Sequence, residues 1–261
     1  MKRWFVLMFG VVSYGLFLVT FLYLAGFVGG FLTPTRLDGP RTGPLGLALA
    51  VDSALILLFG LQHSVMARPG FKAWLTRFVP KPIERSIYVL ASNVALGLMF
   101  WQWRPLGGMV WNAQSTAGHA AWWAMFAVGW LAVLYTTFLI NHFDLFGLRQ
   151  VWLYFRGKPY TSLKFVMPGP YRHIRHPLYV GWMIAFWAAP VMTLAHFVFA
   201  VGMTAYMLIA IWFEERDLVR AHPDYATYRE EVPMLVPRVC APSRPVIGLR
   251  SSGEHRPAAA K

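Results

Sequence analysis

The stretch WFVLMFGVVSYGLFLVTFLYLAGFVGGFL, residues 4–32, decides the fold class of this chain. It carries no charged residue, and the first charge that follows it is Arg36. A helix needs about 20 consecutive apolar residues to cross the hydrocarbon layer of a bilayer. The apolar part of a secretory signal is shorter, at roughly 7–15 residues. We therefore expect an uncleaved membrane-spanning helix here.

Apolar stretches of similar length recur along the chain. Three more single spans are predicted, at 44–66, 86–103 and 118–141. The last apolar block, 178–213, is too long for one span and contains Pro190, which breaks a helix because it lacks an N–H group and clashes with the preceding turn. We predict a hairpin there, with arms at 178–189 and 192–213. The expected fold is all-α: a polytopic membrane helix bundle of four spans plus a C-terminal helical hairpin.

The composition of the whole chain also indicates a membrane protein. Of its 261 residues, 57% are apolar and 13% are charged, and this charged share is about half that of a soluble globular domain. A soluble chain of this length could not bury so much apolar surface, and a disordered chain is poor in apolar residues. The single cysteine, Cys240, excludes an internal disulfide bond and any multi-cysteine metal site.

The net charge of +13 is distributed unevenly between the predicted spans. Segments 67–85 and 142–177 are rich in Lys and Arg, whereas 33–43 and 104–118 carry little net charge. Cytoplasmic loops of membrane proteins carry such an excess of basic residues, so we expect both basic segments and both termini in the cytoplasm. A nucleic-acid-binding protein would gather its basic residues in one patch. We therefore expect membrane lipids as partners, and no nucleic acid.

Polar side chains gather at the cytoplasmic face in this topology. His63 closes the second span, and His142 and Asp144 follow the fourth. The basic turn that opens the hairpin and the carboxylates that leave it lie at the same face. Taken alone, these groups could simply contact lipid headgroups or pair with one another.

The segment GPYRHIRHPLYVG, residues 169–181, could bind an anion. Pro177 suits the first position of a helix, whose free N–H groups and dipole favour a negative charge, and Arg175 could add a bidentate clamp. At the far end of the hairpin, Glu214 and Glu215 could meet a cation or a ribose diol. A ligand such as S-adenosylmethionine would use all of these groups. The candidate cofactor-binding residues are Tyr171, Arg175, His176, Tyr179, Gly181, Glu214 and Glu215.

The same motifs carry a family resemblance. The segment from Arg175 to Gly181, followed by the paired glutamates, resembles the C-terminal half of integral-membrane methyltransferases such as isoprenylcysteine carboxyl methyltransferase and the phospholipid N-methyltransferases, over about residues 165–238. The segments LQHSVMA at 61–67 and NHFDLFG at 141–147 resemble the bacterial methanethiol S-methyltransferase branch.

This second likeness extends over about residues 1–238, which we treat as one membrane domain, and leaves out a Pro-, Gly- and Ser-containing tail at 239–261 that we expect to be disordered. The resemblance implies S-adenosylmethionine as methyl donor, S-adenosylhomocysteine as its product, and methylation of methanethiol, a small apolar thiol, to dimethyl sulfide. It also implies a multi-pass protein of the bacterial inner membrane whose active site faces the cytosol.

A thiol acceptor reacts as its thiolate, and a simple alkyl thiol is mostly protonated at neutral pH, so a nearby base would help. His142 supported by Asp144 is the first candidate for that base, and His63 is the second. Residues two apart do not share a face of a helix. Asp144 must therefore lie beyond the helix if it pairs with His142.

Two other functions stay open at this stage. An enzyme of the same class could act on an isoprenylcysteine or on a lipid amine, and the width of the acceptor pocket would decide between these substrates. A non-catalytic membrane protein could instead hold haem or a metal through His63, His142, His173 and His176, but Arg175 and the glutamates would then have no role. For the methyltransferase we expect no metal. The sequence gives no oligomeric state.

Overall fold

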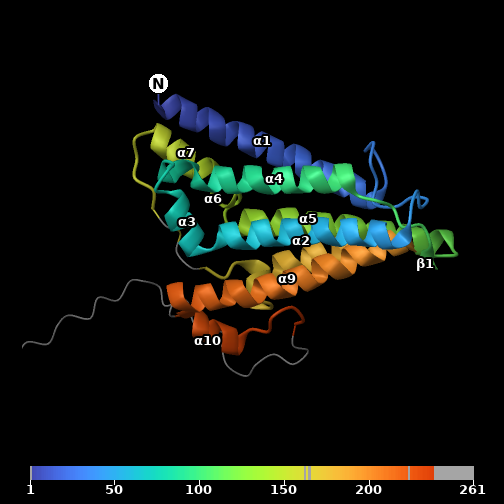
Figure 1. Ribbon diagram of the computed structural model, residues 1–261. Coiled ribbons are helices and arrows are strands. Elements are labelled where there is room, and N and C mark those ends of the chain that lie inside the picture. The colour runs from blue at the N-terminus through green and yellow to red at the C-terminus, as the bar shows by residue number, and fades with distance from the viewer. Residues whose placement is uncertain (1, 162, 164–165, 223, 238–261) are drawn as a thin grey trace, which may run out of the picture.

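The computed structural model describes residues 2–161, 163, 166–222 and 224–237 (Figure 1). The predicted tail at 239–261 lies outside these residues, so the division into a domain at 1–238 and a tail stays a prediction. Within the described ranges, five helices are long and apolar enough to cross a membrane: α1 (Lys2–Gly29), α2 (Leu45–Ala67), α4 (Glu84–Gln102), α5 (Thr116–Ile140) and α9 (Leu194–Ala221).

The structure confirms the expected all-α membrane bundle. Each of the four predicted single spans begins and ends within a few residues of a helix, because a long run of apolar side chains marks such a helix without help from the rest of the fold. The helices α1, α2, α4 and α5 run in alternating directions, so that α1 begins, α2 ends and α5 ends at the same end of the bundle, and α9 runs in the same direction as α5 (Figure 1). We call this the N-terminal end, and the opposite one the far end.

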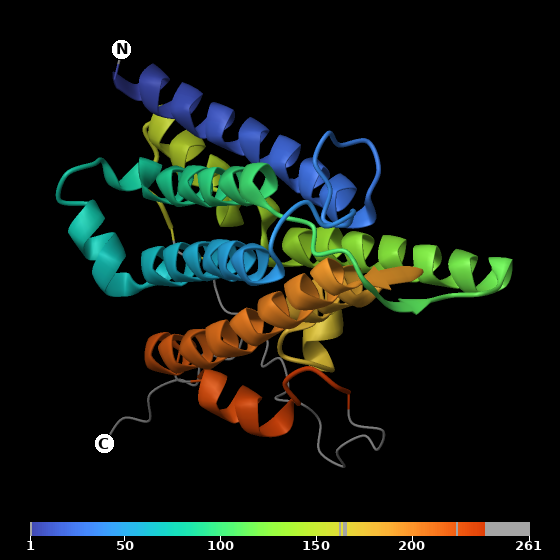
Figure 2. The ribbon, with the colours of Figure 1, turned by 45° about the vertical axis from the view of Figure 1, so that its right-hand side comes forward.

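The predicted hairpin consists of α8 (Pro177–Trp187) and α9, and its two arms differ in length. The 11 residues of α8 rise about 16 Å, whereas the 28 residues of α9 rise about 42 Å and run obliquely across the bundle (Figure 2). The longer arm is therefore a full span in its own right. Pro190 lies in the extended turn between the arms, as the missing N–H group and the ring of proline require.

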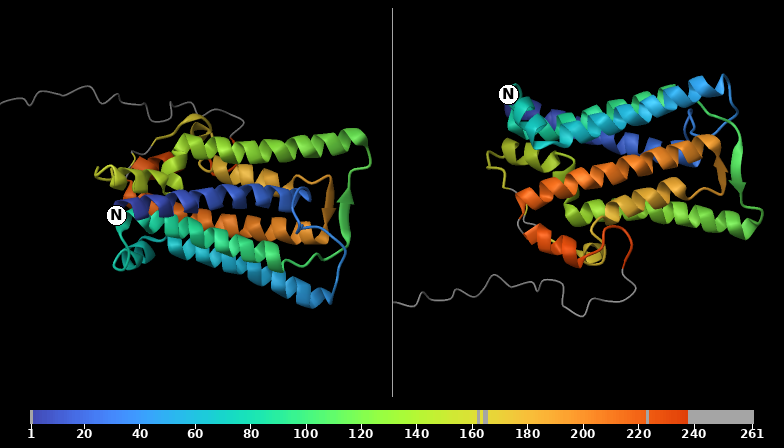
Figure 3. Two further views of the ribbon diagram at one scale, coloured as in Figure 1. Left: turned by 90° about the horizontal axis from the view of Figure 1, so that it is seen from above. Right: turned by 60° about the horizontal axis from the view of Figure 1, so that its bottom comes forward.

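A small sheet at the far end was not predicted. Strand β1 (Met109–Asn112) precedes α5, strand β2 (Val191–Thr193) precedes α9, and the two pair antiparallel (Figure 3). Pro190 extends the pairing, because its carbonyl oxygen accepts a hydrogen bond of 2.9 Å from the backbone N–H of Ala113. The hairpin turn is thus fixed to the α4–α5 connection.

Short elements cover the N-terminal end of the bundle (Figure 1). They are the helices α3 (Pro69–Leu75), α6 (His142–Leu145), α7 (Leu148–Phe155) and α10 (Asp224–Glu231) and the 3-10 turns η1 (Lys81–Ile83) and η2 (Gly169–Arg172). The two basic segments of the sequence contribute all of these elements except α10. The described basic residues of these two segments therefore lie at one end of the molecule.

Two glycines allow α5 and α8 to pack at very short distance. A Cβ atom at Gly129 would lie 2.5 Å from the backbone nitrogen of Ala185, and one at Gly181 would lie 3.0 Å from that of Val133. Small residues at such positions are typical of contacts between membrane helices. This packing fixes the position of α8 and therefore of the basic turn that precedes it.

Candidate active site

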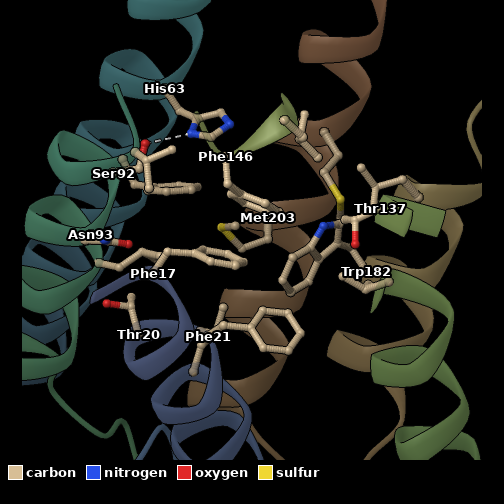
Figure 4. Close-up of a pocket in the computed structure, with 18 of the residues that line it drawn as sticks. Phe17, Thr20, Phe21, His63, Ser92, Asn93, Thr137, Phe146, Trp182 and Met203 are labelled. Atoms are coloured by element: carbon tan, nitrogen blue, oxygen red, sulfur yellow. Dashed lines mark hydrogen bonds between the residues drawn. The ribbon is translucent and has the colours of Figure 1, made fainter. Parts of the chain in front are cut away.

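A cavity of about 260 Å³ lies inside the bundle, between α1, α2, α4, α5, α8 and α9 (Figure 4). Apolar side chains make up most of its wall, and Phe17, Trp182 and Met203 point toward its middle. Polar side chains also line it: Thr20, His63, Arg85, Tyr88, Ser92, Asn93, Thr137, Tyr179 and Tyr206. The cavity therefore combines an apolar interior with a few groups that can bind or move a proton.

His63, the second candidate base, lies on the cavity wall with a hydroxyl group at each ring nitrogen. The hydroxyl of Tyr88 lies 2.6 Å from Nε2, and the hydroxyl of Ser92 lies 3.1 Å from Nδ1. Both partners come from α4, one helical turn apart, whereas His63 comes from α2. The imidazole is thus held in one orientation at the edge of the cavity.

His142, the first candidate base, lies one layer behind the wall. It is 2% exposed, its Nε2 lies 2.9 Å from the hydroxyl of Tyr14, and its Nδ1 lies 2.9 Å from the hydroxyl of Thr137. Of these three residues, Thr137 lines the cavity. Direct contact between His142 and an acceptor in the cavity would therefore require Thr137 to move aside.

The expected support of His142 by Asp144 is wrong. Asp144 accepts hydrogen bonds from Arg149 at 2.8 Å and from the hydroxyl of Tyr160 at 3.2 Å. The reason is local: α5 ends at Ile140, the φ of the next residue, Asn141, is 97°, and a new short helix then contains both His142 and Asp144. Two residues apart on one helix, their side chains point in different directions.

The basic turn and one of the paired glutamates meet at the N-terminal end. Arg175 Nε donates to Glu215 Oε1 at 2.6 Å, and His176 Nε2 lies 2.9 Å from the same oxygen. The guanidinium of Arg175 also donates to the carbonyl oxygens of Arg229, at 2.8 Å, and Val232. Arg175 therefore already binds protein acceptors with most of its donors, which leaves less of it for a ligand carboxylate than we expected.

Glu214 points to the other side of α9 and reaches the cavity wall. The hydroxyl of Tyr179 donates to Glu214 Oε2 at 2.9 Å, and Tyr179 itself lines the cavity. Tyr171 lies near this carboxylate: burial first, and then the charge of Glu214, raise the pKa of Tyr171 above its usual value. Tyr179 thus joins Glu214 to the cavity.

Gly181, the remaining predicted residue, faces a helix. A Cβ atom there would lie 3.0 Å from the nitrogen of Val133 and 3.3 Å from Cβ of Ala132, both on α5. The structure accounts for this glycine by helix packing. Close approach of a ligand to its backbone stays a prediction.

Sequence reasoning missed the hydroxyl partners of the two histidines, namely Tyr14, Tyr88, Ser92 and Thr137. Tyr88 and Ser92 could have been noticed, because they are four residues apart in a predicted span and so share one helix face. Their pairing with His63 on another helix had no signal in the sequence. In the part of the chain that the structure describes, no group of three His, Cys, Asp or Glu side chains is arranged to hold a metal ion.

Comparison with known proteins identifies one matching family and several related proteins. Residues 53–240 match the family described as NnrU protein. A methanethiol S-methyltransferase from Crocosphaera subtropica is 54% identical over 238 residues, which cover 91% of this chain and 93% of the relative. One from Mycobacterium tuberculosis is 52% identical, with coverage of 91% and 98%. Nurim from Mus musculus is 30% identical over 66% of this chain and 68% of its own length. No solved structure shows a significant match.

Proposed function

This chain belongs to the NnrU protein family and to its methanethiol S-methyltransferase branch, and from that premise we propose that it methylates the sulfur of methanethiol to give dimethyl sulfide. The observation that carries this proposal is the cavity, because its volume is about 260 Å³ and its wall is mostly apolar. Pockets for drug-sized ligands usually measure roughly 300–1,000 Å³. A small apolar thiol therefore suits this cavity better than an isoprenyl chain or a lipid tail.

The residues at the N-terminal end fit S-adenosylmethionine as the methyl donor. The carboxylate of Glu214 suits an ammonium group or a ribose diol, and the hydroxyl group of Tyr179 donates a hydrogen bond to it. The rings of Phe17 and Trp182 on the cavity wall suit a sulfonium cation, because aromatic faces attract positive charge. When bound, this donor supplies a methyl group on a positively charged sulfur.

Arg175, His176 and Glu215 complete the proposed cofactor-binding set by holding the start of α8 against α9. Their mutual hydrogen bonds fix the backbone from which Tyr179 projects. Preorganised side chains of this kind raise the rate, because methyl transfer requires the two sulfur atoms and the methyl carbon to be in line.

On the acceptor side, the thiol must lose its proton before its sulfur can accept a methyl group readily. We assign this proton to His63, which lines the cavity. A positioned base contributes about 10²-fold to 10⁴-fold in rate. His142 and Asp144 receive supporting roles: His142 orients Thr137 in the wall, and Asp144 anchors Arg149.

The protein is a multi-pass membrane protein, and we propose that it lies in the bacterial inner membrane with its N-terminal end in the cytosol. The basic segments at that end support this orientation. A charged, water-soluble methyl donor would then reach Glu214 from the cytosol, and an apolar thiol would reach the cavity from the lipid.

Headspace gas chromatography tests the proposed function. Purified protein in detergent receives S-adenosylmethionine and one thiol at a time, from methanethiol to longer alkyl thiols, and a sample without methyl donor serves as the control. We expect dimethyl sulfide from methanethiol, and less product as the thiol lengthens. Absence of any methylated sulfide from a protein that still binds S-adenosylhomocysteine would contradict the proposal and favour an isoprenylcysteine or lipid amine acceptor.

A further inference from the structure

Two histidines of this chain have the same arrangement of hydroxyl partners. His63 lies between Ser92 at Nδ1 and Tyr88 at Nε2. His142 lies between Thr137 at Nδ1 and Tyr14 at Nε2. Each imidazole thus has an aliphatic hydroxyl on one nitrogen and a phenol on the other.

The aliphatic hydroxyl groups determine which ring nitrogen of a neutral histidine carries the proton. Ser92 Oγ donates its proton to the carbonyl oxygen of Tyr88, at 3.0 Å. A hydroxyl has one proton to donate, so Ser92 Oγ accepts the hydrogen bond from His63, and Nδ1 of His63 is the protonated nitrogen. Nε2 therefore has a free lone pair, to which the hydroxyl of Tyr88 donates.

The same reasoning holds for the second histidine. Thr137 Oγ1 donates to the carbonyl oxygen of Leu134 at 2.7 Å and so accepts from Nδ1 of His142. The hydroxyl of Tyr14 then donates to Nε2. Both imidazoles are thus arranged to accept a proton from a tyrosine.

The two arrangements differ in their access to the cavity. Tyr88, His63 and Ser92 all line it, whereas Thr137 is the lining member of the other set. Tyr88 bonds closely to its histidine, at 2.6 Å, and the guanidinium of Arg85 lies over its ring, 5.6 Å from the centroid. A thiol in the cavity can therefore meet the hydroxyl oxygen of Tyr88 while the hydroxyl proton points to His63.

We propose that Tyr88 is a further catalytic residue, which passes the proton of the thiol to His63. In this step the S–H bond breaks and an O–H bond forms at Tyr88, while the original O–H bond breaks and an N–H bond forms at Nε2 of His63. The result is a thiolate, a neutral tyrosine and an imidazolium, which releases its proton to water before the next turnover. Ser92 is a positioning residue that keeps Nε2 free. The inference rests on the proposed function, because it assigns the thiol to this cavity.

The experiment compares Tyr88→Phe with the matched control Tyr14→Phe, which removes the equivalent hydroxyl from the other histidine. The value of kcat/KM for methanethiol is measured from pH 6 to 9, and binding of S-adenosylhomocysteine reports on the fold. Without the relay, the rate depends on thiol that has already ionised. We expect Tyr88→Phe to lose about 10²-fold at pH 7 and its kcat/KM to rise tenfold per pH unit. The wild-type protein and Tyr14→Phe should instead level off within this range.

Three results would overturn the inference. The first is a wild-type rate and pH profile in Tyr88→Phe, which would leave the proposed function intact. The second is the same change of profile in Tyr14→Phe, because the effect would then not depend on access to the cavity. If Tyr88→Phe fails to bind S-adenosylhomocysteine, His63→Gln takes its place, and a wild-type profile in that variant is the third. Absence of dimethyl sulfide with the wild-type protein would instead contradict the proposed function and this inference with it.

Discussion

One carboxylate oxygen of Glu215 accepts hydrogen bonds from both Arg175 and His176. The side chains of Arg175 and Glu215 are 10% and 11% exposed. Removing one partner of a buried pair leaves a charge without compensation and costs roughly 3 kcal/mol. We therefore expect Glu215→Gln to lower the midpoint of thermal unfolding in detergent strongly.

The control for this prediction is Asp217→Asn, two residues further along α9. Its ion pair with Arg68 is more accessible, with side chains 25% and 28% exposed, and an exposed pair contributes about 0–1 kcal/mol. A small shift is expected there. Equal shifts of the unfolding midpoint in the two variants would show that the Glu215 contacts stabilise the protein no more than the accessible Asp217–Arg68 pair does.

His142 gives a prediction for pH. It lies outside the membrane-spanning helices, and burial lowers its pKa below the usual value. In the unfolded chain, where a histidine has an ordinary pKa of about 6.5, His142 therefore binds a proton at a higher pH than it does in the folded protein. The contribution of His142 to the free energy of unfolding is fully present above the unfolded-state pKa. It falls as the pH drops below that value, by at most about 1.4 kcal/mol per pH unit for one proton. The unfolding midpoint of the wild-type protein should fall between pH 7 and 5.

A His142→Gln variant lacks this titration, so its midpoint should fall less over the same interval. Other titrating groups affect both proteins alike and cancel in the comparison. Parallel pH curves for the two proteins would contradict the buried, neutral state of His142.

The sequence allowed part of the site to be predicted at this scale. Arg175, His176 and Glu215 could be placed at one end of the bundle because topology alone decides which end of a helix faces which side. The partners of His63 could not, because they depend on the rotation of α2 and α4 about their axes. The pairing of His142 with Asp144 was wrong because the left-handed Asn141 starts a new helix, and no residue pattern marked that break.

Contacts between elements, and not single residues, set the shape of the cavity. Phe17 of α1 stacks on Phe146, which follows α6, with ring centroids 3.7 Å apart. Phe146 is followed by Gly147, whose φ is +90° and where a Cβ atom would lie 3.0 Å from the nitrogen of Ser86. This connection must therefore keep a glycine, and it holds the Phe146 ring against α1.

The stacked rings predict which thiols are accepted. Phe17→Ala should enlarge the cavity and allow longer acceptors. One methylene in an apolar pocket changes the ratio of kcat/KM between two substrates by roughly 10-fold or more. We expect the ratio of kcat/KM for propanethiol to that for methanethiol to rise at least about tenfold. Trp152→Ala is the control, because Trp152 on α7 is 50% exposed. An unchanged ratio in Phe17→Ala would mean that other residues limit acceptor size.

Helices of this chain were easier to predict than their contacts. Hydropathy is a local property, and it located α1, α2, α4 and α5 within a few residues. The β1–β2 pairing joins segments far apart in the chain and has no hydropathy signal of its own. The role of Gly129 likewise could not be predicted from the sequence, since it depends on Ala185 lying against it from another helix.

At the scale of the whole molecule, the candidate cofactor-binding residues and the basic segments lie at the same end of the bundle. The N-terminal end holds the basic segments, and it also holds Arg175, His176 and the two glutamates, whereas polar groups at the far end bind loops. Asp52, for example, accepts a hydrogen bond of 2.9 Å from the backbone N–H of Arg104. The basic residues are thus placed where they can set the orientation of the protein, and in the proposed orientation they bring the site to the side of the proposed charged methyl donor.

This orientation can be measured with single cysteines. In a Cys240→Ser background, Gln114→Cys places a thiol at the exposed far end, and Lys158→Cys places one at the exposed N-terminal end. Because cytoplasmic segments carry the excess of Lys and Arg, a membrane-impermeant maleimide added to spheroplasts should label Gln114→Cys and spare Lys158→Cys. Both should react once the membrane is permeabilised, which shows that each thiol is accessible. Labelling of Lys158→Cys in intact spheroplasts would place the glutamates outside the cell, away from the cytosolic methyl donor, and would contradict both the orientation and the route by which the donor reaches Glu214.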